Sequence, residues 1–196
     1  MLQVYTETKG KTIKINSAFK EWRSVIEALG NGEQIIILRK GGIIEDEGDF
    51  VPKEKYFFLF PTLTHEREGY LKKTYHKQQE LSEDELEIKY WADTVLARKV
   101  EDEETLKKLS PYHIWSDETV LERFHRWGKD EVWCLVVRVF KLKNPIKIKM
   151  KPEYGGCKSW IDISENIDIQ ESTPVLSDKD FEAKFNEVVK ILEKQK

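Results

Sequence analysis

Two basic segments of this chain carry residue types that bind anions. In the first, Arg39-Lys40-Gly41-Gly42 ends a fully apolar run. In the second, Gly155-Gly156-Cys157-Lys158-Ser159-Trp160 places a lysine and a tryptophan after two glycines. Glycine lets backbone approach a ligand closely, and cations beside it form an anion-binding concavity. These segments therefore predict a recognition site, in which Arg39 binds phosphate or carboxylate through parallel hydrogen bonds.

Aromatic residues give the predicted site a second kind of contact. Trp160 and Trp115 could offer faces on which a base or another planar ring stacks, with Lys158 beside the ring. The other interpretation of the same residues is structural. In that case Arg39 and Lys40 end a strand and point into water, Trp160 belongs to the core, and the glycines form turns. Both interpretations remain open at the level of sequence.

Histidine is the candidate for acid–base chemistry. His65 precedes a glutamate and His113 precedes Ile114-Trp115, and an imidazole near pKa 6.5 suits a general base. The alternative is that each ring is solvated or structural. The sequence has neither Cys-x-x-Cys nor His-Glu-x-x-His, and the acidic run at 45–49 lacks calcium-loop spacing. We therefore expect no metal and no cofactor.

A stripe of lysines is a further candidate surface. The lysines alternate with apolar residues along a predicted strand, so they could follow a phosphate backbone or could simply blunt an exposed edge. They are Lys141, Lys143, Lys147, Lys149 and Lys151.

Composition limits the classes of function. The chain has 196 residues, 39% hydrophobic, and a net charge of −3. This predicts one globular domain over 1–196, with a polar stretch at about 65–85 as a mobile insertion. A dedicated non-specific nucleic-acid binder is usually basic, so any binding of RNA, DNA or a nucleotide must use a local patch. The 35% of charged residues suggests ion-pair networks and a thermostable protein.

Location follows from what the sequence lacks. Two cysteines are too few for a disulfide framework, and the N-terminus has no basic-then-apolar signal. The longest apolar runs are much shorter than a membrane span. We expect a cytoplasmic protein with no membrane partner.

Apolar periodicity predicts the elements that would position these residues. Buried strands are expected at 33–38 and 56–60, and longer strands at 86–100 and 132–142. A helix is expected after Ser17, carrying Phe19 and Trp22. Two more are expected after Ser116, with Trp127 facing inward, and after Ser177. Because strands outnumber helices without βαβ alternation, the predicted class is α+β with a mixed, largely antiparallel sheet.

Four motifs together resemble family 1802 of the domains of unknown function, from about residue 22 to residue 192. That family has no assigned activity, so the resemblance implies a grouping only. The motifs are Leu38-Arg39-Lys40-Gly41-Gly42-Ile43, Phe58-Leu59-Phe60-Pro61-Thr62, His113-Ile114-Trp115 and Gly155-Gly156-Cys157-Lys158-Ser159-Trp160.

The order of helix, Gly32 and a strand ending in Arg39 also resembles ASCH domains, which are PUA-like barrels. Gln34 and Ile37 stand where the ASCH motif has lysine and glutamate. The second half is similar in order to the EVE branch of these barrels. The resemblance implies a small mixed barrel with flanking helices that binds RNA or modified bases beside the barrel.

Three functions are consistent with these observations. The first is a module that binds RNA, DNA, a nucleotide or a modified base through the two basic segments. The second is a hydrolytic or transfer enzyme acting on nucleotides or nucleic acid, with His65 or His113 as general base. The third is a structural or interaction protein without a ligand. The first requires that the two basic segments converge in space.

Overall fold

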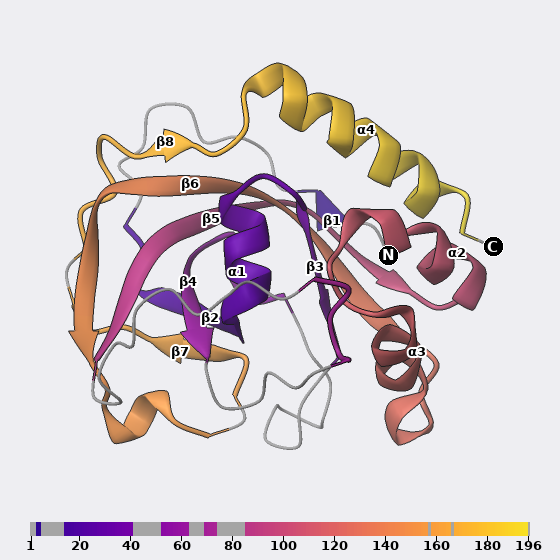
Figure 1. Ribbon diagram of the computed structural model, residues 1–196, viewed down its shortest axis with the longest axis horizontal. Helices are drawn as coiled ribbons and strands as arrows, with labels where there is room; N and C mark the ends of the chain where they lie inside the picture. Colours follow the sequence, from indigo (N-terminus) through magenta and orange to yellow (C-terminus); the bar gives the residue numbers. More distant parts are fainter. Residues whose placement is uncertain are drawn as a thin grey trace.

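A single curved β-sheet organises the described part of the chain (Figure 1). The computed structural model describes residues 3–4, 14–40, 52–62, 69–73, 85–156, 158–165 and 167–195. Gly41, Gly42, His65 and Cys157 lie outside these ranges. So does most of the predicted insertion at 65–85, which therefore stays a prediction.

The sheet follows the order β3-β6-β5-β4-β2-β7. Strand β2 pairs with β4 in parallel, and every other pairing of named strands is antiparallel. This confirms the predicted α+β class with a mixed, largely antiparallel sheet. The strands are β1 (Gln3–Val4), β2 (Ser17–Trp22), β3 (Ile36–Arg39), β4 (Tyr56–Thr62), β5 (Glu85–Val100), β6 (Val132–Lys149), β7 (Trp160–Asp162) and β8 (Thr173–Pro174).

Side chains of the central strands alternate between two apolar cores. In β4, Phe57 and Leu59 join the first core while Phe58 and Phe60 join the second. The long strands β5 and β6 contribute to both cores, and their pairing shifts register at two points. Such irregularities bend a sheet. The bend fits the strong curvature of β5 and β6 in Figure 1.

Helices flank the sheet, as expected. In Figure 1, α1 (Arg23–Gly30) lies in front of the sheet, α4 (Asp178–Glu193) lies along the edge drawn at the top, and α2 (Glu103–Lys108) and α3 (Asp117–His125) lie at one end. The predicted caps are confirmed, because Ser116 accepts from the Thr119 amide and Ser177 from the Asp180 amide. Among the described residues, no helix is both long and apolar enough to cross a membrane.

The predicted helix after Ser17 is wrong in its first turn. Residues Ser17–Trp22 form β2, which lies between β4 and β7, and α1 begins only at Arg23. Phe19 and Trp22 have helical spacing by coincidence. Ala18 and Phe19 are both fully buried, in different cores, as expected of a central strand.

The inward position expected for Trp127 is also wrong. Helix α3 ends at His125, and the Trp127 side chain is 49% exposed. Its backbone has φ 61° and ψ 24°, which is the left-handed region. The apolar pattern was extended two residues beyond the point where the helix stops.

Candidate functional site

Arg39 joins the two ends of the sheet. It is the last residue of β3, and its Nε donates to Oγ of Ser159 at 2.8 Å. Ser159 is fully buried and directly precedes β7. The Arg39 guanidinium carbon lies 5.3 Å from the centroid of the Phe19 ring on β2. The structure therefore brings Arg39 of the first basic segment to Ser159-Trp160 of the second.

Arg123 is the second guanidinium at this end of the sheet. It comes from the last turn of α3, and its guanidinium carbon lies 3.6 Å from the Trp115 ring centroid and 5.8 Å from that of Trp22. Burial lowers its pKa to about 10; Glu21 opposes this shift, and the nearby positive charge of Arg39 adds to it. Arg123 is therefore still charged at neutral pH.

Neither guanidinium is neutralised by a hydrogen-bonded carboxylate among the described residues. Arg39 has a single hydrogen bond there, from Nε to Ser159, and Arg123 has none. Glu21 is the acidic residue closest to balancing them. Its side chain is 1% exposed, and its Oε1 accepts from the backbone amide of Trp22 at 2.8 Å. We call this group the arginine–tryptophan cluster, and its members are Glu21, Trp22, Arg39, Trp115, Arg123, Ser159 and Trp160.

The tryptophans of the cluster differ in what they offer. Trp115 is fully buried, with its ring 4.7 Å from Trp22 and its face against Arg123. It therefore positions Arg123 and has no face open to a ligand. Trp22 and Trp160 are half-buried. The Trp160 ring packs edge-on against Phe19, at 4.9 Å between centroids.

Lys40 lies beside the cluster but is used by the fold. Its Nζ donates to the carbonyl oxygens of Phe124 and Glu131, each at 2.9 Å, and to that of Lys129. These three carbonyls belong to the end of α3 and the turn after it. Lys40 thus anchors that turn to the end of β3.

The glycines of the second segment form a turn that encloses another cation. Gly156 has φ +74°, a backbone conformation that favours glycine. Its carbonyl and that of Tyr154 accept from Nζ of buried Lys20 at 2.7 and 2.8 Å. Gly155 and Lys158 are exposed. This turn therefore binds a side chain of the protein itself.

His113 is buried and neutral. Its ring is 5% exposed, and neither nitrogen has a hydrogen-bond partner among the described residues. Burial, with a smaller contribution from Lys72, lowers its pKa to about 4. A ring so enclosed has no access to a substrate in this conformation. The described ranges also hold no group of three or more His, Cys, Asp and Glu side chains arranged for a metal.

The lysine stripe is interleaved with acidic residues. Lys147 and Lys149 on β6 lie directly opposite Glu87 and Glu85 on β5. Lys143 pairs with Glu171, and Lys151 with Glu165 at 2.7 Å. This arrangement supports the structural interpretation of the stripe, as an exposed face with compensated charge.

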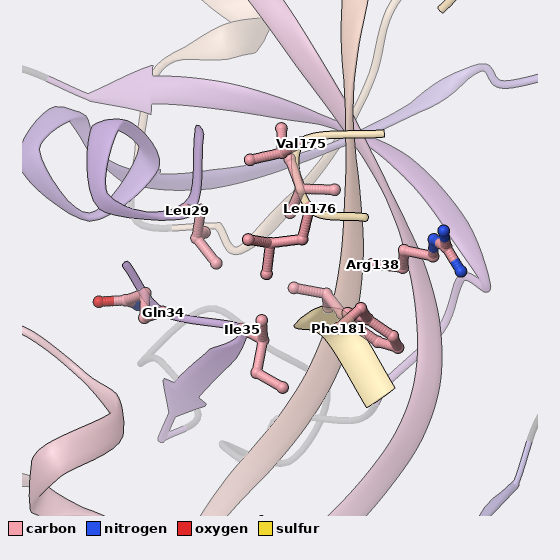
Figure 2. A pocket seen from close by; sticks show the side chains of 9 residues that line it. Leu29, Gln34, Ile35, Arg138, Val175, Leu176 and Phe181 are labelled. Carbon is pink, nitrogen blue, oxygen red and sulfur yellow. The ribbon is translucent and has the colours of Figure 1, made fainter. Parts of the chain in front are cut away.

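A pocket lies between α1, β6 and the start of α4, and its lining includes no member of the cluster (Figure 2). Its cavity volume is about 10 Å³, counted as space open to the centre of a water-sized sphere. That is room for roughly one water molecule. Gln34 and Arg138 direct their polar ends away from its apolar centre. The pocket is too small for a nucleotide.

Sequence reasoning missed three charged residues here: Lys20, Glu21 and Arg123. A signal was present in Ala18-Phe19-Lys20-Glu21-Trp22, where two charges interrupt an apolar run. Read as a strand buried on both faces, that run predicts two buried charges. Buried charges need partners, and these partners mark the site. Gln34, which stands at the ASCH lysine position, is structural. Its amide donates to the Ile36 carbonyl and accepts from the Ile114 amide.

Comparisons with known proteins agree with both sequence resemblances. Residues 18–187 match the model described as Domain of unknown function (DUF1802). The ASCH protein of Zymomonas mobilis is 11% identical over 90% of this chain and 94% of that chain, with a TM-score of 0.42. Two mutant forms of it match at 12% and 10% identity over 68% of this chain and 76% and 73% of theirs, with TM-scores of 0.42 and 0.41. No curated protein matches.

Proposed function

We propose, from the premise that this chain belongs to the DUF1802 family, that the protein is a nucleic-acid or nucleotide binding module. In this proposal Arg39 and Arg123 bind a phosphate group of the ligand. The half-buried rings of Trp22 and Trp160 line the approach of a base. Lys158 contributes long-range attraction as an exposed cation.

The observation that carries the proposal is the pair of arginines. Each guanidinium has five N–H donors, yet among the described residues the pair makes one hydrogen bond to a side chain. The charge of each disfavours the other, as the lowered pKa of Arg123 records. A phosphate dianion between them would satisfy several donors and relieve this repulsion.

The surroundings favour a planar anion over a simple one. Phe19, Trp22, Trp115 and Trp160 surround the guanidiniums with aromatic surface. Stacking on aromatic rings contributes about 1–3 kcal/mol per base and does not need a basic protein overall. A local basic site on a chain of net charge −3 therefore suffices.

The test is a binding titration. Fluorescence anisotropy of labelled single-stranded RNA and DNA hexamers, at about 50 and 200 mM salt, measures affinity and its salt dependence. Arg39→Ala should weaken binding about tenfold, because it removes one charge-assisted contact. Arg39→Lys keeps the charge but loses the planar fork, so it should recover only part of the affinity.

The matched control is Lys190→Ala, which removes one positive charge from an exposed position on α4. It should leave the affinity within about twofold of the parent. If no hexamer and no nucleotide binds at micromolar protein, the proposal fails. An equal loss with Lys190→Ala would show a general charge effect and would also refute it.

A further inference from the structure

Trp127 is a large aromatic residue held in an unusual and open position. Its side chain is 49% exposed, and its φ of 61° is rare for a residue with a bulky side chain. Gly128 follows in the same left-handed region, at φ 69°. Strained backbone with an exposed aromatic ring is an observed outlier of the kind that clusters at functional sites.

The turn that carries Trp127 is fastened to the arginine–tryptophan cluster. Lys40, next to Arg39, donates to carbonyls of Phe124, Lys129 and Glu131, which flank Trp127 on both sides in the sequence. Arg123 precedes Trp127 by four residues, so their Cα atoms are at most about 14 Å apart. The exposed ring therefore lies a short distance from the two guanidiniums.

The charged side chains around the ring are engaged with one another. Arg126 donates to Glu122 at 2.6 Å, with its guanidinium carbon 5.9 Å from the Trp127 ring centroid. The His125 ring contacts Asp130 at 2.9 Å. No aromatic side chain of the described residues stacks on Trp127. The indole thus presents a face that nothing in the described part of the chain covers.

We infer that Trp127 is a stacking platform for a base of a single-stranded oligonucleotide whose phosphate lies at Arg39 and Arg123. The inference rests on the proposed function and narrows its ligand class. A mononucleotide engages the arginine pair alone, whereas an oligonucleotide also reaches Trp127. The turn is fixed by Lys40 before the ligand arrives, so the ring need not be ordered on binding.

The experiment compares two ligands with three variants. Labelled hexauridylate and hexaadenylate report binding of a strand, and calorimetry with UMP and AMP reports binding of one nucleotide. Trp127→Ala should weaken hexamer binding about 5- to 150-fold and leave mononucleotide binding unchanged. Trp127→Phe should retain most of the affinity. Trp127→Gly, which suits the left-handed backbone, should match Trp127→Ala in binding while melting no lower than the parent.

Each outcome bears on a different claim. Unchanged hexamer affinity in Trp127→Ala overturns the inference and leaves the proposed function standing. Equal losses for hexamer and mononucleotide also overturn it, because Trp127 would then act by supporting the cluster. If the parent protein binds neither ligand, the proposed function fails, and the inference fails with it.

Discussion

His113 should make the protein less stable in mild acid. In the unfolded chain its imidazole has the ordinary pKa of 6.5, while burial and the charge of Lys72 lower the pKa in the folded state to about 4. Between these values the unfolded state binds more protons than the folded state. Stability therefore rises with pH across this window and falls as the solution is acidified from 6.5 toward 4.

The magnitude follows from the size of the shift. One pKa unit corresponds to 1.36 kcal/mol, so the shift of His113 represents about 3 kcal/mol in full. Over the accessible range from about pH 7 to pH 5, the expected loss is about 2 kcal/mol. The ring is 5% exposed, so solvent screening reduces this value little.

The assay is urea unfolding followed by tryptophan fluorescence at a series of pH values. His113→Phe replaces the ring by one of similar size that does not titrate, and neither imidazole nitrogen has a hydrogen-bond partner among the described residues to lose. The difference in unfolding free energy between parent and variant should change by about 2 kcal/mol between pH 7 and pH 5. His125→Gln, at an exposed histidine whose pKa is raised by Asp130, should retain the parent's loss. Parallel pH profiles for the parent and His113→Phe would refute this reasoning.

Two other predictions concern stability. Lys40→Met should lower the free energy of unfolding by about 2 kcal/mol, because its Nζ hydrogen bonds to three carbonyls are lost, whereas Lys141→Met at an exposed position should change it by less than about 0.5 kcal/mol; equal effects in a urea titration would contradict the anchoring role. Burial raises the pKa of the Glu165 carboxyl, but hydrogen bonds from Lys151 and Tyr154 outweigh it and lower the pKa to about 2. The stability from this carboxylate is thus present above its ordinary pKa of 4.5 and lost as pH falls toward 2. Glu165→Gln should flatten the acid side of the stability profile, and an unchanged profile would refute the assignment.

Much of the fold could be predicted because it is encoded locally. The buried runs that form β3 and β4, the capping serines at 116 and 177, and the apolar stripe of α4 each depend on a few neighbouring residues. The first turn of the predicted helix after Ser17 failed because Phe19 and Trp22 fit both helical and strand spacing. Only the pairing of β2 with β4 and β7 decides between them.

The candidate site was predictable in part. Arg39 and the segment around Trp160 stood out by composition, and the structure brings them together through Ser159. Arg123 could not be found in this way, because its place beside Arg39 depends on how α3 packs, 84 residues along the chain. Trp115 looked like a binding residue, but burial makes it the surface on which Arg123 rests.

The last residue of β3 and the one after it have separate tasks. The guanidinium of Arg39 reaches the serine before β7, while the ammonium of Lys40 reaches the turn after α3. Successive side chains on an extended backbone point in opposite directions, so these assignments depend on strand phase. Deleting one residue from β3 would exchange the two directions and turn the fork toward the carbonyls and the ammonium toward the serine. Evolution can therefore vary the length of the segment after Lys40 more freely than the length of the strand before it.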